Sequence, residues 1–346
     1  MISTPNQRER LKQVCAVASL DPVSTPQLVE SYSNDTWRIE DLRAGPMVLR
    51  VSWRGDVSRL IREVLVTRHM PAGIRYPEVL GSGLTELHGF PLAYSFTRLL
   101  PGSGLSASWG GMDRAERRSA IAQLATMMRE LHQWSPPAQL VPQLLARDQL
   151  LDGIDGLLGA DINPLPVTRA MNLAEHAKGM PFVDAGLMAD AVGVLRKYQH
   201  LDPLVDSPAQ HGLIHGDVHL SNLWRPEPGG LALLDLEWAR FAPPLLDIQR
   251  LCEVADDDVL RGAGPHPEIL RWMAEDYPEI LQIPDAAGRM LLFSVAYTIR
   301  GVIVAPPQAP AGKLPPDHAV RRLRRMVEGQ WPAPGALPDA LQSPGA

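Results

Sequence analysis

One short segment, HGDVHLSN at residues 215–222, constrains this chain more than any other part of its sequence. It places Asp217 and Asn222 five residues apart, and a second acidic segment, DLE, begins at Asp235 and ends at Glu237. Carboxylate and amide oxygens are the ligands that Mg²⁺ prefers in proteins. The spacing matches neither the H-E-x-x-H motif nor the Cys and His spacings of zinc sites. The segment therefore favours a fold that brings these oxygen-bearing side chains together.

The pattern of apolar residues divides the chain into two parts. From residue 25 to about 98, alternating apolar residues separated by polar turns predict a small sheet, with one inserted helix at 58–70 and a turn at His88–Gly89. Beyond it the apolar spacing is helical, most clearly at 115–134. A short buried strand is expected at 231–239, and further helices at 245–256, 267–277, 286–303 and 318–326.

We therefore predict an α+β protein of two lobes, a size that 346 residues permit. Residues 1–97 would form an N-terminal lobe with the sheet and one helix, and residues 98–330 a larger helical lobe. The Pro- and Ala-rich tail at 331–346 is expected to be disordered. The basic run at 318–326 and the acidic run at 253–260 are interpreted as solvated helix faces. For the acidic run an alternative is an anionic wall that attracts a cationic ligand.

Charge and composition narrow the class of partner and the location. The net charge of −6 argues against nucleic acid, which requires a concentrated basic surface. The two cysteines imply no disulfide framework. The polar start has no apolar leader segment, and the apolar stretch at 290–305 is interrupted by Arg300 and shorter than a span of about 20 residues. We expect a cytoplasmic protein with no membrane partner; the sequence does not specify the oligomeric state.

The spacing of the polar residues fits the transfer of a phosphoryl group. That reaction requires an acceptor for the hydroxyl proton, a Mg²⁺ ion on the phosphates and hard oxygen ligands for the metal. Asp217 would serve the hydroxyl, while Asn222 and Asp235 would serve the metal. Protein kinases place H-R-D, four residues and Asn before a downstream D-F-G. This chain has the same spacing but carries Gly216 in place of Arg and Glu237 as the last residue of DLE.

On these residues, HGDVHLSN followed by DLE resembles the aminoglycoside phosphotransferase and choline kinase-like superfamily. Its members phosphorylate hydroxyl groups of small molecules with a protein-kinase-like fold. The resemblance covers residues 25–304 and implies that Asp217 orients and deprotonates the acceptor. It further implies that Asn222 and Asp235 hold Mg²⁺, with Glu237 as a further metal ligand or a brace behind the site.

Weaker similarities in the N-terminal part extend the resemblance to a nucleotide site. YSNDTWRI (32–39) resembles the hairpin that covers the nucleotide, so Ser33 and Asn34 are expected near phosphate, although a G-x-G is missing. Arg50 stands at the position of the family's phosphate-binding lysine, and Glu63 at that of its partner glutamate. Arginine keeps the charge of lysine but is forked, so it would bind phosphate in a different geometry.

Three further assignments come from the resemblance. FTRLLPG (96–102) resembles the hinge whose backbone meets adenine, which brings Phe96 and Arg98 into the nucleotide site. His215 is expected to brace the catalytic loop, and Asp247 to steady it.

The resulting expectation is a Mg²⁺-dependent kinase that moves the γ-phosphate of ATP or GTP to a small-molecule hydroxyl. An aminoglycoside-type or other antibiotic is the preferred acceptor, because the family resemblance includes such kinases and a cationic compound would suit the acidic run. Metabolic kinases of the choline, amino-sugar, homoserine or methylthioribose type share the motifs and stay open. Two other classes also stay open: a pseudokinase-like binding module, favoured by Arg50 and the weak nucleotide loop, and a metal hydrolase using His211, His215, His219 and Asp235.

Overall fold

The structure is a computed structural model in which the chain forms two compact units. It describes residues 5–31, 34–53, 57–145, 165–202, 211–304, 309–333 and 336. The first unit combines residues 1–110, 136–155 and 220–239, and the second combines residues 111–135, 156–219 and 240–346. The segment that carries Asn222 and Asp235 thus belongs to the same unit as the N-terminal sheet, whereas the residues on both sides of it in the sequence belong to the second unit. These units are not continuous in sequence, whereas the predicted lobes were divided after residue 97. The division into two kinase-like lobes stays a prediction.

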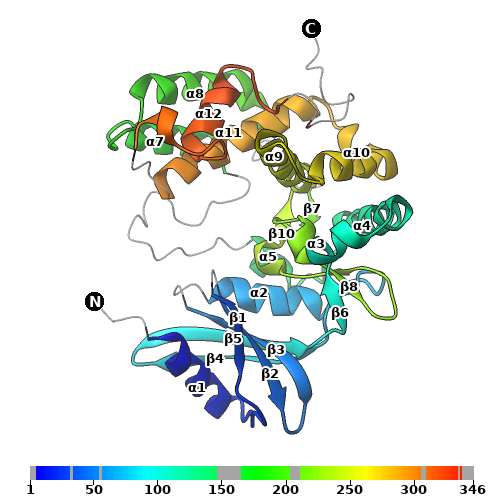
Figure 1. The fold of residues 1–346 in the computed structure, drawn as a ribbon. Helices are drawn as coiled ribbons and strands as arrows, with labels where there is room; N and C mark the ends of the chain where they lie inside the picture. Colours follow the sequence, from blue (N-terminus) through cyan, green and yellow to red (C-terminus); the bar gives the residue numbers. More distant parts are fainter. Residues whose placement is uncertain are drawn as a thin grey trace. The chain divides into compact units, whose positions relative to one another are not determined.

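The first unit is built on an antiparallel sheet of five strands in the order β1-β2-β3-β5-β4 (Figure 1). The strands are β1 (Gln27–Ser31), β2 (Asn34–Asp41), β3 (Gly45–Ser52), β4 (Val79–Leu87) and β5 (Phe90–Arg98). Between β4 and β5 the chain reverses in two residues, His88 and Gly89, with left-handed φ values of 55° and 81°. Such φ values match the twist of the flanking strands. The predicted sheet and its predicted hairpin turn are confirmed.

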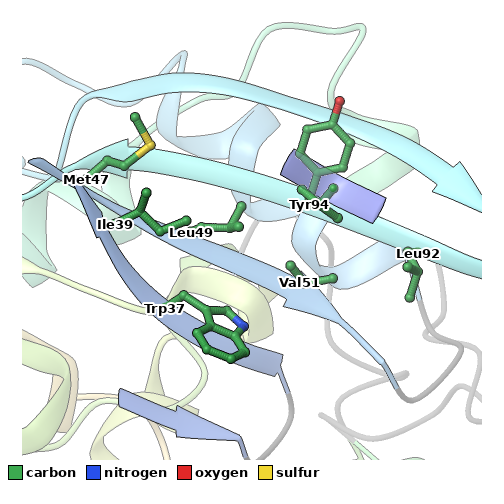
Figure 2. Packing of buried hydrophobic residues seen from close by; sticks show 8 residues of the cluster. Trp37, Ile39, Met47, Leu49, Val51, Leu92 and Tyr94 are labelled. Atoms are coloured by element: carbon green, nitrogen blue, oxygen red, sulfur yellow. The ribbon is translucent and has the colours of Figure 1, made fainter. Parts of the chain in front are cut away.

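The two faces of this sheet carry different side chains. Helix α1 (Gln7–Val17) covers one face, where Val14 joins a buried apolar cluster. The cluster also contains Trp37, Ile39, Met47, Leu49, Val51, Leu92 and Tyr94 (Figure 2). Because successive side chains of a strand point to opposite faces, Arg50 lies on the other face from its neighbours Leu49 and Val51. That second face meets helix α2 (Ser58–Thr67).

A smaller sheet completes the first unit, with strands in the order β6-β8-β9. Its strands are β6 (Gly102–Gly104), β8 (Leu223–Pro226) and β9 (Ala232–Leu233), and the unit adds α3 (Leu105–Ser108) and α5 (Val141–Leu145). The strand predicted at 231–239 is wrong in length. Asp235 adopts a left-handed conformation with φ 60°, and the chain then turns into the 3₁₀ helix η5 (Leu236–Trp238). A left-handed residue ends the extended ladder, so only two residues pair as β9.

The second unit is helical and confirms the helices predicted after residue 115 (Figure 1). Its helices are α4 (Arg114–Gln133), α7 (Val167–Ala177), α8 (Ala185–Tyr198), α9 (Leu245–Arg261), α10 (His266–Asp276), α11 (Ala286–Val304) and α12 (Ala319–Val327). Helix α11 packs against α7, α8, α9 and α12. Among the described residues it is the one helix long and apolar enough to cross a membrane, and 61% of its most apolar window is buried within the protein. Burial on several sides is typical of a core helix.

The interpretation of the acidic and basic runs as solvated faces is wrong. Asp256 on α9 accepts two hydrogen bonds from Arg325 on α12, both at 2.7 Å, and it is fully buried. Asp257 accepts two from Arg322, at 2.7 and 2.8 Å. The two runs therefore neutralise each other. The described part of the tail also packs here, since the backbone N–H of Ala333 donates to Asp256 at 2.6 Å; residues 337–346 lie outside the described part.

We predict that Arg325→Met destabilises the protein by about 3 kcal/mol or more, because removing one partner leaves a buried charge without its counter-ion. The free energy of unfolding in urea measures this. Arg324→Met is the matched control on the same helix, since Arg324 and its partner Asp184 are both largely exposed. Its expected loss is below about 1 kcal/mol. Equal losses in the two variants would contradict the assignment of a buried ion pair.

Candidate active site

One arginine and three carboxylates converge in the first unit, where β3, α2 and η5 meet. Arg50 on β3 donates from Nη1 to both carboxylate oxygens of Glu63 on α2, at 2.6 Å each. Its Nη2 donates to Oδ1 of Asp235 at 2.5 Å and to Oε2 of Glu237 at 3.2 Å. The side chain of Asp235 is 31% exposed, whereas those of Glu63 and Glu237 are buried. Four predicted site residues from three stretches of sequence are thus brought together, and we call them the Arg50 cluster.

The Arg50 cluster has more negative than positive charge. Burial disfavours charged Arg50, but Asp235, Glu63 and Glu237 outweigh burial and raise the pKa of Arg50 well above its ordinary value. For Glu63, burial and the like charges of Asp235 and Glu237 raise the pKa to about 7, although Arg50 opposes them. Burial, the largest of these effects, disfavours the ionised form of Glu63 even beside Arg50. The cluster thus holds three carboxylates against one guanidinium.

Three further residues, which the sequence did not indicate as partners of the cluster, hold Glu63 and Glu237 in place. The side-chain amide of Asn34 donates to Glu237 Oε2 at 2.6 Å, and Arg62 Nη2 donates to the backbone carbonyl of Glu237 at 3.0 Å. The hydroxyl of Tyr76 donates to Oε1 of Glu63. Asn34 was expected to cover phosphate; here it is buried and engaged with Glu237.

Asn222 reaches the neighbourhood of Asp235 through the backbone of the β8–β9 hairpin. Leu223 pairs with Leu233, and the N–H of Leu234 donates to the carbonyl of Asn222 at 2.9 Å. Asp235 follows directly, and its left-handed backbone redirects the chain at that point. The hairpin therefore brings the backbones of Asn222 and Asp235 close together, although the two residues are thirteen positions apart in sequence.

This donor set fits Mg²⁺ better than a hydrolytic zinc. Mg²⁺ is usually bound through one or two protein oxygens together with phosphate and water, and Asn222 and Asp235 supply such oxygens. A catalytic zinc requires three converging His, Cys or carboxylate ligands. Among the residues that the structure describes, no three such side chains form a metal-binding group. His211, one member of the proposed zinc set, lies edge-on against Phe241, with ring centroids 6.2 Å apart. The metal-hydrolase alternative thus lacks a ligand set in the described chain.

Asp217 lies in the second unit, in the loop after strand β7 (Gly212–Ile214), which pairs with β10 (Arg240–Ala242). Gly216 has φ 83°, a conformation that disfavours other residues, which accounts for glycine in place of the kinase arginine. Asp247 at the start of α9 accepts the backbone N–H of His215 at 2.9 Å and that of Gly216 at 2.8 Å. The Nδ1 of His215 accepts the N–H of Asp217 at 3.3 Å. The loop is therefore held by its backbone.

His132 at the end of α4 ties this support to the rest of the second unit. Its Nε2 lies 3.0 Å from Oδ2 of Asp247, and its Nδ1 lies 3.2 Å from the hydroxyl of Tyr277. The backbone of β7 at Gly212 lies close to the backbone of His132, since a Cβ added at Gly212 would be 2.1 Å from the carbonyl oxygen of His132. Only glycine allows β7 to run so near the end of α4. The position of Asp247, and through it of the loop, thus depends on the packing of α4 against β7.

The carboxylate of Asp217 is paired with a cation. Arg250 on α9 donates from Nε to Oδ1 of Asp217 at 2.8 Å, and His219 Nε2 lies 3.5 Å from Oδ2. Burial works against the charged carboxylate, but the hydrogen bond from His219 and the charge of Arg250 outweigh it and hold the pKa of Asp217 well below its usual range. Asp217 is therefore ionised at any ordinary pH, a state suited to accepting a hydrogen bond from a hydroxyl.

Comparison with known proteins places this arrangement in a family. The model of a family described as "Phosphotransferase enzyme family" matches residues 25–275, most of the chain. The chain belongs to the phosphotransferase enzyme family. No curated protein sequence matches it significantly.

Several solved structures share the fold of this family member at low sequence identity. Aminoglycoside phosphotransferase APH(4)-Ia is 18% identical, with a TM-score of 0.61 over 93% of this chain and 99% of that chain. The amicoumacin kinase hAmiN, in complex with AMP-PNP, Ca²⁺ and Ami, is 12% identical, with a TM-score of 0.62 over 98% and 97%. The GDP complex of aminoglycoside 2′-phosphotransferase-IIIa is 14% identical, with a TM-score of 0.60 over 94% and 98%. The predicted superfamily and the predicted kinase-like α+β fold are confirmed.

Three predicted nucleotide-site residues have side chains that do not join the Arg50 cluster or that lie outside the described residues, so their role at a nucleotide stays a prediction. Phe96 pairs with Leu49 in the register of β5 and β3, so its side chain lies on the α1 face, opposite Arg50. Its ring lies over Gly81 and is stacked with Tyr94 at 6.4 Å. Arg98 is exposed and pairs with Glu78 at 2.7 Å. A hinge contact would thus involve backbone rather than these side chains. Ser33 lies outside the described residues.

Sequence reasoning missed Arg250, His132 and Tyr76 as parts of the site. Arg250 follows Asp247 by three positions in α9, so one helical turn places it on the same side of the helix. That spacing was available in the sequence. Tyr76 offered no comparable signal, because it lies in a loop thirteen residues from Glu63 and only tertiary folding brings them together.

Proposed function

We propose that this phosphotransferase moves the γ-phosphate of ATP or GTP to a hydroxyl group of a small molecule in a Mg²⁺-dependent reaction. The observation that carries the proposal is the Arg50 cluster, in which three carboxylates face one guanidinium beside the hairpin that carries Asn222. Transfer of a phosphoryl group depends on positioning and on neutralising phosphate charge. A cluster with surplus negative charge and one fixed cation supplies sites both for a metal ion and for phosphate oxygens.

The proposed roles follow the chemistry of each group. Asn222 and Asp235 would hold Mg²⁺, which would supply positive charge to the phosphates. Arg50, positioned by Glu63, would contact phosphate. Glu237 would brace Arg50, whose guanidinium also contacts Asp235. Asp217 would accept the hydrogen bond of the acceptor hydroxyl and orient it for attack. No covalent intermediate on the protein is needed, because orientation and electrostatics carry the reaction.

The acceptor is proposed only as a small-molecule alcohol. The earlier preference for an aminoglycoside-type antibiotic rested in part on the acidic run at 253–260, and Asp256 and Asp257 in that run are neutralised by arginines. The remaining support is likeness to solved antibiotic kinases, which at 12–18% identity concerns the fold alone. One of these structures, APH(4)-Ia, contains hygromycin B, and another, APH(2″)-IIia, contains kanamycin. Antibiotics and metabolic alcohols therefore both belong in the first panel of acceptors.

A second candidate, a binding module without transfer activity, is favoured by one observation. Arg50 contacts Asp235 directly at 2.5 Å, so the guanidinium occupies a carboxylate that a metal ion would use. If Arg50 never left Asp235, nucleotide would bind without a response to Mg²⁺. Intact Asp217, Asn222 and Asp235 favour the enzyme instead.

One experiment separates the two candidates. ADP release from ATP, and GDP release from GTP, are measured with and without Mg²⁺ against aminoglycosides, amino-sugars, choline, homoserine and neutral sugars. We expect at least one acceptor to raise release in the presence of Mg²⁺, and Asp217→Ala to abolish that increase. Nucleotide binding that is indifferent to Mg²⁺, with no acceptor raising release, would support the binding module and refute the proposal.

A further inference from the structure

Helix α1 carries a buried arginine beside its apolar contacts with the sheet. The side chain of Arg10 is 5% exposed and pairs with Asp35, whose side chain is fully buried. Its Nε donates to Oδ2 of Asp35 at 2.6 Å, and its Nη2 donates to Oδ1 at 2.9 Å. Its Nη1 donates to the backbone carbonyl of Pro5, and the guanidinium lies 5.5 Å from the centroid of the Trp53 ring. The forked guanidinium therefore holds both oxygens of one carboxylate in a fixed direction.

Asn34 and Asp35 are the first two residues of β2, and their side chains lie on opposite faces of the sheet. Asp35 pairs with Val51 in the register of β2 and β3, so it lies on the face that α1 covers. Asn34 lies on the face of Arg50, where its amide donates to Oε2 of Glu237 at 2.6 Å. The beginning of β2 is thus held on one face by α1 and on the other by the Arg50 cluster.

The contact between Asn34 and Glu237 depends on where β2 lies. The Glu237 oxygen that accepts from Asn34 also accepts from Arg50 Nη2, at 3.2 Å. Asn34 and Glu237 are both buried, and leaving a buried acceptor without its donor is unfavourable. The position of β2 relative to α1 therefore sets how Glu237 is held against Arg50.

The ion pair of Arg10 and Asp35 specifies geometry more than stability. Taking two charges out of water costs roughly what their attraction gains, so apolar residues in their place are often at least as stable. Val14 on the same helix packs into the apolar cluster, and such a contact has no preferred direction. Two hydrogen bonds to one carboxylate, by contrast, fix both distance and angle. The ion pair is therefore the contact of α1 that fixes the beginning of β2.

We infer that Arg10 is a positioning residue for the nucleotide site: by holding the beginning of β2, it keeps Asn34 in contact with Glu237. That contact in turn braces Arg50. The inference rests on the proposed function, since it takes the Arg50 cluster as the place where Mg²⁺ and phosphate bind. Arg10 lies outside residues 25–275, which the family model matches. Its effect reaches the site only through β2.

The test measures the dissociation constant of AMP-PNP by calorimetry at saturating Mg²⁺, at a temperature at which every variant is folded. Arg10→Met is expected to raise the constant by about tenfold, the lower end of the about 10- to 100-fold that groups behind metal ligands contribute. Asn34→Ala should raise it to a similar extent. Combining the two changes should raise it no further than the larger single effect, because both act through one contact.

Two further variants separate positioning from stability. Val14→Ala removes a buried apolar contact of the same helix, so it should lower the melting temperature and leave the dissociation constant unchanged. Arg10→Met combined with Asp35→Asn leaves no unpaired charge buried, so it should melt at a higher temperature than Arg10→Met alone. It should still bind AMP-PNP about tenfold more weakly than the unmutated protein. This combined variant decides the question where Arg10→Met alone does not fold.

Hydrogen exchange of the ligand-free protein gives a readout that needs no nucleotide. Arg10→Met combined with Asp35→Asn should speed exchange of backbone amides at the beginning of β2 more than in β5, because only β2 loses its support. An unchanged dissociation constant in both Arg10 variants, an equal rise in Val14→Ala, or additive effects with Asn34→Ala would overturn the inference. If the unmutated protein bound no nucleotide, the proposed function would fail, and exchange in β2 would still decide whether Arg10 holds this strand.

Discussion

Asp217→Asn is expected to lower kcat for phosphoryl transfer by about 10³-fold, within the range of about 10²–10⁴ that a positioned acid–base group contributes. The amide keeps the size of the carboxylate but loses its charge, so it orients the acceptor hydroxyl poorly and cannot take its proton. The dissociation constant of Mg²⁺–AMP-PNP should change by less than about threefold, because the proposed metal and phosphate ligands are other residues. Initial rates with the best acceptor and calorimetric titration with AMP-PNP measure the two quantities.

Arg250 adds a pH signature to this prediction. A carboxyl group with its pKa held well below the usual range stays ionised throughout the pH range in which the protein can be assayed. Activity of the unmutated protein should therefore show no loss between pH 7 and about pH 5 from protonation of Asp217.

Asp190→Asn is the matched control, since it makes the same charge change at an exposed position of the second unit. It should retain full activity. Full activity in Asp217→Asn would refute the role of Asp217, and an equal loss in both variants would point to a general effect of charge.

The spacing of apolar residues predicted the fold because the sheet and helix α4 each bury mainly one face. The alternation at 28–53 follows from a sheet whose one face is buried by α1, so Leu49 and Val51 are apolar and Arg50 between them is not. Helix α4 was equally clear, since its apolar stripe packs on one side and Asp113 and Glu116 form a capping box at its start. Local pattern and tertiary burial agree in these segments.

Contacts between polar residues far apart in the chain could not be predicted from the sequence. Nothing in the acidic run distinguishes a solvated face from one paired with Arg322 and Arg325, because both helices have the same composition in either case. The left-handed backbone of Asp235 was likewise hidden, since aspartate tolerates this conformation without requiring it. The motif spacing led to Asp235 and Glu237, and the family resemblance led to Arg50 and its partner Glu63, but the direct pairing of Asp235 and Glu237 with Arg50 emerges only from the fold.

Asp235→Ala is expected to remove the response of nucleotide binding to Mg²⁺. The dissociation constant of Mg²⁺–AMP-PNP should rise by roughly 100-fold or more, because even groups behind metal ligands contribute about 10- to 100-fold. At a ligand concentration 100 times its dissociation constant, the unmutated protein should gain about 2.7 kcal/mol in stability, and the variant almost none. Calorimetry and thermal melting with and without Mg²⁺ measure these effects. Asp21→Ala, at an exposed position of the same unit, should behave as the unmutated protein does.

The ligand-free variant provides an independent readout of the Arg50 cluster. The pKa of Glu63 is raised to about 7, and Asp235 is one of the causes after burial. A carboxyl group whose pKa is higher in the folded than in the unfolded state stabilises the fold below pH about 4.5, and that contribution is lost as the pH rises toward 7. Removing Asp235 removes one like charge, so the loss of unfolding free energy between pH 4.5 and 7 should be smaller in Asp235→Ala. An unchanged pH profile, together with Mg²⁺-dependent nucleotide binding in the variant, would show that Asp235 is neither a metal ligand nor coupled to Glu63.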